Sequence, residues 1–242
     1  MEFDCAAALL IVRTKRDEEV EIRADNVRSE VFGDTVPWRR FRWYRGQKHY
    51  SGSYWSTTES GHVVYESLLE LSRLLLADFD PAVRQIRAQP CLIRARVNGK
   101  IRRHIPDYWL LTRDGPVLVA VKPAALVTDP NVAFTLSWVS EVAQRLGWGF
   151  EVASEPPAAV LENVRFLAGF RRVEWIDSAV LESLRGINLD GLRFGTVAAG
   201  VDAPEPLVRA GLLHLLWTDE LVTELAEVLS ANSVLHTRVG SA

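Results

Sequence analysis

Residues 101–123 of the chain read IRRHIPDYWLLTRDGPVLVAVKP. Two strand patterns, Tyr108–Thr112 and Val117–Val121, are separated by the turn residues Arg, Asp, Gly and Pro. The second pattern is an uninterrupted apolar run, typical of a strand that is buried on both faces. Asp107 precedes the first strand and Lys122 follows the second. A tight hairpin would therefore bring the side chains of Asp107 and Lys122 together.

The segments on either side of this hairpin alternate between helical and strand patterns. Apolar residues recur every three or four positions between His62 and Ala77, which predicts a helix that includes Glu66. Asn98-Gly99 is a strong hairpin turn, because both residues tolerate positive φ. The other predicted elements are strands over Val83–Arg87, Cys91–Val97 and Ile101–Ile105, a helix over Asn131–Leu146 and a strand over Trp148–Ala153. We therefore expect an α/β fold.

Three regions of the chain differ in composition. Residues 1–60 form a basic and aromatic N-terminal section that we expect to be largely irregular. Residues 61–154 form the α/β core, and Ser154–Pro157 is the best candidate for a linker. Residues 155–242 are acidic and mostly helical, which favours contact with a protein over DNA. The further elements expected are strands over Ala6–Val12 and Val20–Arg23, helices over Ala158–Phe170, Ser178–Arg185, Pro206–Trp217 and Asp219–Ser230, and a strand or wing over Val234–Arg238.

The composition excludes several classes of protein. Hydrophobic residues make up 48% and charged residues 24% of the 242 residues, which is typical of a globular chain and not of a disordered one. Cys5 and Cys91 are too few for a disulfide framework. No apolar run approaches the ~18 residues of a membrane span, and the acidic Glu2 and Asp4 stand where a secretory signal would be basic. We therefore expect a cytoplasmic protein without a membrane partner.

The net charge of −3 conceals an uneven distribution. Two segments, between Pro37 and Thr58 and between Pro81 and Pro106, contain basic residues and no acidic ones, and aromatic residues are interleaved in the first. Such segments suit contact with the phosphates and bases of nucleic acid, although a basic run can also be a solvated loop. The candidate DNA-binding residues are Arg39, Arg40, Arg42, Arg45, Lys48, Arg102 and Arg103.

Glu66, Asp107 and Lys122 are the candidate catalytic residues. A carboxylate that binds Mg²⁺, beside an ammonium group that orients water or neutralises phosphate, supplies metal-assisted phosphodiester hydrolysis. The chain has four lysines and 24 arginines, so a lysine at this strand end indicates a need for a compact charge. Each residue also has a structural interpretation: Pro-Asp is a common turn, a terminal lysine reaches solvent, and Glu66 can pair with Arg73.

Several short segments together resemble one known family. In this order and spacing, they are similar to the TnsA-like endonuclease subunits of heteromeric transposases over roughly residues 37–175. The segments are Tyr44–Gln47, Ser51–Thr58, His62–Glu70, Asp78–Pro81, Gln89-Pro90, Arg103–Asp107, Val119–Pro123 and Asn163–Leu167. The resemblance implies the restriction-endonuclease-like PD-(D/E)xK fold, in which a mixed sheet is flanked by helices.

The resemblance also implies an activity, a cofactor and partners. The activity is cleavage of the non-transferred 5′ strands of double-stranded DNA at transposon ends, with Mg²⁺ as cofactor and Mn²⁺ as a substitute. A TnsB-like DDE transposase would join the other strands, and a TnsC-like AAA+ ATPase would regulate the assembly. In this family pattern Glu66 is the helix carboxylate near the metal, Asp107 the central ligand, the Val121 carbonyl a further ligand and Lys122 the motif lysine.

The chain departs from the family pattern at Ala120, two residues before the motif lysine, where an oxygen donor is expected. A methyl group cannot bind Mg²⁺, so either Glu66, Glu70 or Gln89 supplies an oxygen instead or cleavage is impaired. Three hypotheses follow: a DNA endonuclease subunit, a catalytically impaired subunit that binds DNA and bridges partners, and a defence or repair nuclease that shares the fold.

Overall fold

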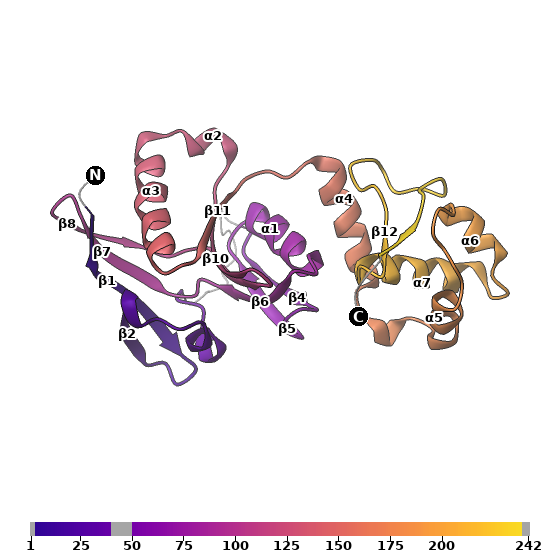
Figure 1. The fold of residues 1–242 in the computed structure, drawn as a ribbon, viewed down its shortest axis with the longest axis horizontal. Coiled ribbons are helices and arrows are strands. Elements are labelled where there is room, and N and C mark those ends of the chain that lie inside the picture. Colours follow the sequence, from indigo (N-terminus) through magenta and orange to yellow (C-terminus); the bar gives the residue numbers. More distant parts are fainter. Residues whose placement is uncertain (1–2, 40–49, 239–242) are drawn as a thin grey trace. The chain divides into compact units, whose positions relative to one another are not determined.

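The computed structural model describes residues 3–39 and 50–238, which form two compact units of mixed α/β structure (Figure 1). Unit 1 comprises Met1–Asp78 and Ala82–Glu155, and unit 2 comprises Phe79–Pro81 and Pro156–Ala242. The division after Glu155 lies within the segment expected to be a linker. Residues 1–60 fall in the same unit as residues 61–154, apart from the short Phe79–Pro81 segment.

A four-stranded sheet in unit 1 contains the hairpin expected from residues 101–123. Its strand order is β11-β10-β9-β6, with β10 parallel to β11 and the other neighbours antiparallel. The strands are β6 (Val83–Ala88), β9 (Tyr108–Thr112), β10 (Gly115–Val121) and β11 (Gly149–Ala153). Residues Thr112 and Gly115 close the β9–β10 turn, where a φ of +118° at Gly115 suits glycine. The predicted hairpin is thus confirmed.

Helices pack against both faces of this sheet. Helix α1 (Leu68–Phe79) shares one core cluster with Val119 and Val121, whereas α3 (Pro130–Arg145) shares another with Leu118. Successive residues of β10 reach different cores because side chains alternate across a strand. This is why residues 117–121 are apolar without interruption, and it leaves the end of β10 as the place where a polar side chain can emerge.

Helix α3 begins and ends at recognisable capping residues. The side chain of Asp129 accepts hydrogen bonds from the backbone N–H groups of Asn131 and Val132, and Pro130 occupies the first turn. Gly147, with a φ of +71°, follows the last turn. A short helix, α2 (Ala124–Val127), connects β10 to α3. The expected helix over Asn131–Leu146 is therefore confirmed to within one residue at each end.

A second sheet in unit 1 has the order β2-β1-β7-β8 and is antiparallel throughout. Its strands are β1 (Phe3–Thr14), β2 (Glu19–Arg23), β7 (Leu92–Val97) and β8 (Lys100–His104), and β3 (Thr35–Val36) also pairs with β1. Strand β1 pairs on both sides and buries Leu10 and Val12. The strands expected over Ala6–Val12 and Val20–Arg23 are therefore confirmed, whereas the expectation that they belong to a largely irregular section was wrong for the described residues.

The start of helix α1 differs from the sequence prediction. Residues Gly61–Tyr65 form strand β5, paired with β4 (Gly52–Ser56), and the helix begins only at Leu68. The β-branched and aromatic side chains of Val63, Val64 and Tyr65 favour a strand over a helical turn. Ser67 then caps the helix, because its Oγ accepts a hydrogen bond from the backbone N–H of Glu70 at 3.1 Å. Glu66 consequently lies between β5 and α1 and not on the helix.

Unit 2 is mostly helical, with helices that surround the buried α7. The elements are α4 (Ala158–Leu167), α5 (Ser178–Arg185), α6 (Phe194–Gly200), α7 (Glu205–Trp217), β12 (Leu221–Val222) and β13 (His236–Thr237). The helix expected over Asp219–Ser230 is absent from the described chain. Leu221 pairs with Thr237 instead, and the side chain of Asn163 bonds the backbone of Leu225, Glu227 and Leu229, so tertiary contacts override the local helical pattern.

In the part of the chain that the structure describes, no helix combines the length and apolarity needed to cross a membrane.

Candidate active site

The β9–β10 hairpin places Asp107 and Lys122 side by side. The backbone N–H of Asp107 donates to the carbonyl of Val119 at 3.0 Å, which continues the ladder of the sheet. Oδ2 of Asp107 accepts a hydrogen bond from the backbone N–H of Val121 at 2.6 Å and lies 3.5 Å from Nζ of Lys122. The proximity expected from the sequence is therefore confirmed. The same Nζ donates to the Val121 carbonyl at 2.8 Å.

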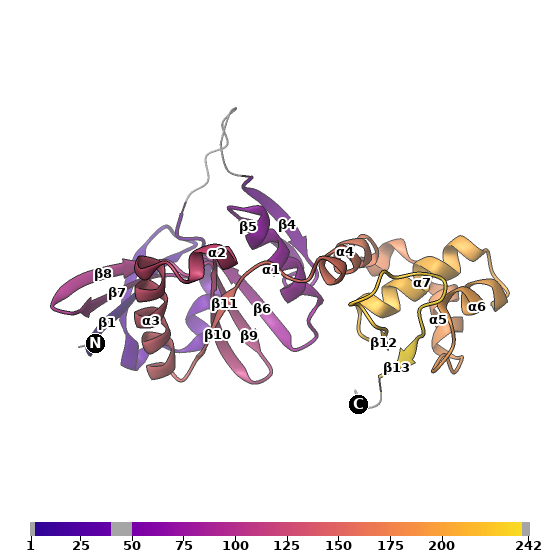
Figure 2. The same cartoon turned by 90° about the horizontal axis from the view of Figure 1, so that it is seen from above.

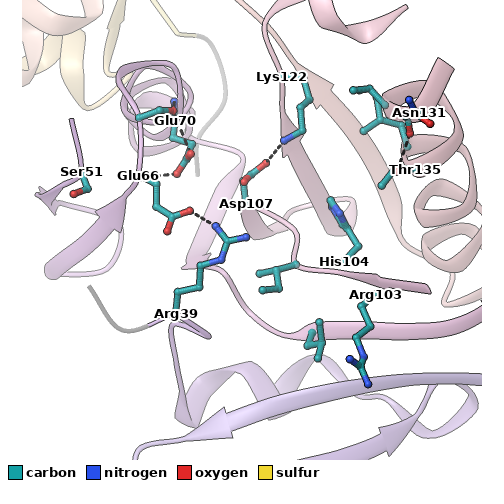
Figure 3. Close-up of a pocket in the computed structure, with 15 residues that line it drawn as sticks. Arg39, Ser51, Glu66, Glu70, Arg103, His104, Asp107, Lys122, Asn131 and Thr135 are labelled. Atoms are coloured by element: carbon teal, nitrogen blue, oxygen red, sulfur yellow. Dashed lines mark hydrogen bonds and ion pairs between the residues drawn. The ribbon is translucent and has the colours of Figure 1, made fainter. Parts of the chain in front are cut away.

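These two residues line a cavity of about 820 Å³ in unit 1 (Figure 3). Asp107 lies between a wall formed by residues around the start of α1 and a wall formed by α3. The charged and polar residues that line the cavity are Arg39, Ser51, Glu66, Ser67, Glu70, Arg103, His104, Asp107, Lys122, Asn131 and Thr135. All three candidate catalytic residues therefore face one cavity, together with two of the candidate DNA-binding arginines.

Glu66 and Glu70 form the α1 side of the cavity. Oε2 of Glu70 accepts a hydrogen bond from the backbone N–H of Glu66 at 2.8 Å, and Oε1 accepts one from the Ser67 hydroxyl at 3.1 Å. The Glu70 carboxylate is thus held rigidly by the helix cap. The Glu66 carboxylate instead forms an ion pair with Arg39, drawn as a dashed line in Figure 3. The alternative pairing of Glu66 with Arg73 is excluded for the described structure, since Arg73 binds Glu151.

Two carboxylates of this cavity, Glu70 and Asp107, have raised pKa values. The pKa of Glu70 is raised to about 7, mainly by burial and to a smaller extent by the neighbouring charges of Asp107 and Glu66. Burial also raises the pKa of Asp107, against the opposing effect of the Lys122 ammonium group. Carboxylates that repel one another across a buried site are stabilised by a bound cation. The site therefore favours the binding of a positive charge.

Arg39 is distant in sequence from most of the cavity residues, and hydrogen bonds to Gln89 hold its backbone beside the cavity. The backbone N–H groups of Trp38 and Arg39 donate to the backbone carbonyl and the side-chain oxygen of Gln89, each at 3.0 Å. The backbone N–H of Gln89 in turn donates to the carbonyl of Asp107 at 2.9 Å. Gln89 has a φ of +45°, a conformation that is strained for a residue other than glycine. Its side-chain oxygen is thus engaged in positioning Arg39.

Ala120 contributes no oxygen to the cavity. It is fully buried, and the described residues that line the cavity do not include it. Of the three residues considered as substitutes, Glu66 and Glu70 line the cavity and Gln89 does not. The second carboxylate of the site is therefore supplied by residues at the start of α1.

His104 also lines the cavity, although no role was predicted for it from the sequence. Its pKa is lowered to about 4, mainly by burial and to a smaller extent by the positive charges of Lys122 and Arg39, so it is neutral near pH 7. Its ring lies edge-on to Trp138, and its Nε2 is buried without a hydrogen-bond partner among the described residues. Asn131 and Thr135 were also not anticipated, since nothing in a helical pattern distinguishes a side chain that faces a cavity from one that faces water.

The candidate DNA-binding residues are only partly described. Arg39 and Arg103 line the cavity, while Arg102 is exposed on β8 with its guanidinium 5.2 Å from the ring centre of Phe134. The remaining four, Arg40, Arg42, Arg45 and Lys48, lie outside the described residues. The structure therefore brings two basic residues to the cavity and leaves a third beside it.

The donor set fits Mg²⁺ on the chemistry of its oxygens. Among the described residues there is no group of three or more His, Cys, Asp or Glu side chains arranged to enclose a metal. Mg²⁺ does not require one, because it is commonly held by one or two carboxylates, waters and substrate phosphates. In the described part of the chain no hydrogen bond reaches Oδ1 of Asp107, so this oxygen is open to a ligand. Asp107 and Glu70, with Glu66 after release from Arg39, are the residues that would hold the ion.

No protein-family model matches this chain, and no curated protein is similar to it in sequence. Its function is therefore inferred from the residues of the cavity.

Proposed function

We propose that unit 1 is a Mg²⁺-dependent DNA nuclease with a restriction-endonuclease-like core. We further propose that the chain is the TnsA-like endonuclease subunit of a heteromeric transposase. In this role it cuts the non-transferred 5′ strands at transposon ends, in the cytoplasm, with a TnsB-like DDE transposase and a TnsC-like AAA+ ATPase as partners. One observation carries the proposal: Asp107 and Lys122 meet at the end of a hairpin, in a cavity that also contains Glu66 and Glu70.

The fold is compatible with this class. Helix α1 precedes strands β6, β9 and β10, and helix α3 and the parallel strand β11 follow them. The helices lie on opposite faces of the sheet, and the β7–β8 hairpin is inserted between β6 and β9. This is the helix, strands, helix, strand order that the resemblance implies for the nuclease core. A mixed sheet of this kind serves many functions, so the cavity residues and not the fold carry the argument.

The residues of the cavity have separable tasks in phosphodiester hydrolysis. When bound, Mg²⁺ polarises a phosphate oxygen and lowers the pKa of a coordinated water. Asp107, fixed by the Val121 N–H, would supply an oxygen ligand to the ion. Lys122 holds a compact positive charge next to Asp107, where it can neutralise charge that develops on phosphate. Arg39 and Arg103 add cations at the cavity wall, which suits a polyanionic substrate.

The proposal is tested by strand-resolved cleavage of duplex DNA that carries transposon ends. The purified chain is incubated with its DDE transposase and Mg²⁺ or Mn²⁺, and the 5′ strands are separated on a denaturing gel. We expect the wild type to cut these strands and the Asp107→Asn and Lys122→Ala variants to leave them intact. Asp114→Asn, at the exposed β9–β10 turn, is the matched carboxylate control and should cut normally. If none of the four proteins cuts the 5′ strands, the nuclease proposal is contradicted and a subunit impaired by Ala120 is favoured.

A further inference from the structure

The β7–β8 hairpin extends away from the cavity, and β1 pairs with its inner strand β7 as far as Val97, next to the tip. Its outer strand β8 is at the edge of the sheet, and this end of the sheet projects from the rest of unit 1 in both views (Figures 1 and 2). His104, at the base of β8, lines the cavity, and Gly99 forms the tip. At ~3.3 Å per residue, the five residue steps from Gly99 to His104 span roughly 17 Å. The outer strand β8 is therefore an exposed edge that starts at the proposed active site.

The positive charge of β8 is not compensated within the described part of unit 1. Four consecutive residues, Lys100 to Arg103, are exposed. Three of them are cations, and none forms an ion pair with another described residue. Arg94 on the inner strand β7 differs, because its guanidinium binds both carboxylate oxygens of Glu21 at 2.8 and 2.9 Å. The outer strand thus retains a row of charge that attracts a polyanion.

The side chains of β8 point to both sides of the hairpin. Alternation along the strand places Lys100 and Arg102 on one face and Ile101 and Arg103 on the other. Arg102 lies over Phe134 of α3, while Arg103 lines the cavity. Ile101 is 62% exposed beside the tip. An exposed edge strand with cations on both faces is suited to contact with the phosphate backbone of nucleic acid.

Charges on an edge strand have another common use, which is to prevent sheets from pairing edge to edge. That explanation accounts for the cations of β8. It does not account for Ile101, because an exposed isoleucine on an edge strand promotes such pairing. It also gives no reason for the charged row to lead into the cavity.

We propose that the outer strand β8 lies along the phosphate backbone of duplex DNA next to the cavity, and this rests on the proposed function. Its length of roughly 17 Å corresponds to about five base pairs at 3.4 Å each, so β8 holds DNA that flanks the phosphate in the cavity. Lys100 and Arg102 contact the backbone without reading its sequence, and Ile101 lies against the same DNA.

The test measures binding of the full chain to a fluorescein-labelled duplex of mixed sequence, in EDTA, as a function of salt. We expect Lys100→Gln/Arg102→Gln to reduce the magnitude of the slope of log K against log[salt] by about 1.8, or 0.9 per lost phosphate contact. Arg102→Lys alone keeps the charge and should keep the slope. The matched control is Arg84→Gln/Arg113→Gln, two exposed cations at the opposite end of the four-stranded sheet. This pair should leave the slope unchanged.

A photo-crosslinking amino acid at position 101 should couple to the duplex, whereas the same group at position 113 should not. Equal slopes for the two double variants, or no crosslink from position 101, would overturn the inference. Self-association of Lys100→Gln/Arg102→Gln with an unchanged slope would also overturn the inference. It would indicate that the cations of β8 prevent sheets from pairing edge to edge. The binding assay contains EDTA and is therefore independent of cleavage. If the slope falls in Lys100→Gln/Arg102→Gln but the wild type does not cut DNA in Mg²⁺, only the proposed function is contradicted. If the wild type cuts DNA in Mg²⁺ but the slope is unchanged in Lys100→Gln/Arg102→Gln, only the role of β8 is contradicted.

Discussion

Nζ of Lys122 lies 3.5 Å from Oδ2 of Asp107, across a hairpin whose turn is five residues or more from either residue. The pair exists because Asp107 immediately precedes β9 and Lys122 immediately follows its antiparallel partner β10. The apolar run of β10 fixes the register, since a one-residue slip would move every buried side chain to the other face. The contact is thus specified by the core on both sides of the sheet.

Lys122→Ala is expected to reduce DNA cleavage by roughly 10²–10³-fold, the usual cost of removing one group that stabilises transition-state charge. Lys122→Arg should not restore the rate, because a planar guanidinium does not replace a compact ammonium beside Asp107. Single-turnover cleavage at saturating DNA measures both effects. Rescue of the full rate by arginine would contradict the role given to Lys122.

Glu70 makes the stability of the metal-free protein depend on pH. The ordinary pKa of 4.5 applies in the unfolded chain, whereas burial raises the pKa to about 7 in the folded protein. Between these values the folded state holds more protons, so the Glu70 contribution to the free energy of unfolding falls as pH rises through this window. Urea denaturation in EDTA at several pH values should show a smaller decline for Glu70→Gln than for the wild type.

An equal pH dependence in the wild type and Glu70→Gln would contradict this account of Glu70. Glu151→Gln is a useful comparison because it removes a carboxylate from unit 1 outside the cavity. The Glu151→Gln variant retains Glu70, so it should keep the wild-type decline in the free energy of unfolding between pH 4.5 and 7.

Combined neutralisation of Arg39, Arg40 and Arg42 is expected to weaken DNA binding and to reduce the salt slope by as much as about 2.7, at 0.9 per phosphate contact. Arg39 is held at the cavity by Gln89, so Gln89→Ala should produce part of the same loss without removing a charge. Fluorescence anisotropy over a salt series checks both variants. An unchanged slope in the triple variant would exclude phosphate contact by this segment.

Asp78 is expected to be a stability residue of unit 1. Its buried carboxylate accepts hydrogen bonds from the hydroxyls of Tyr54 and Ser56 and from the backbone N–H groups of Thr57 and Thr58. Asp78→Ala leaves these donors unsatisfied and should lower the free energy of unfolding by about 3 kcal/mol. Urea denaturation measures the change, and Asp114→Ala should differ little from the wild type. A loss below about 1 kcal/mol for Asp78→Ala would contradict this role.

The parts of the fold that were predicted correctly depend on local chemistry. Asn98-Gly99 and Gly115 specify hairpin turns through positive φ, and Asp129 and Gly147 delimit α3. These local signals predict that Asp107 and Lys122 lie together, and no distant contact is needed for that prediction. The proximity of the pair could therefore be predicted from residues 101–123 alone.

The parts that were not predicted depend on distant contacts. Arg39 meets Glu66 only because Gln89 holds the backbone before Arg39, and no local pattern encodes that arrangement. The expected helix over Asp219–Ser230 does not form, because the side chain of Asn163 on α4 donates hydrogen bonds to the backbone of this segment. Glu66 was placed on a helix because the apolar spacing of Val63 to Tyr65 fits both a helix and a strand.

The central claim is that Asp107 belongs to a divalent-cation site, and calorimetric titration of the full chain with Mn²⁺ tests it most directly. Changes of residues that merely support a ligand cost about 10–100-fold in metal affinity, so Asp107→Asn should cost at least about tenfold. Asp114→Asn, at the exposed turn of the same hairpin, should bind as the wild type does. Equal Mn²⁺ affinity in the wild type and Asp107→Asn would contradict the account.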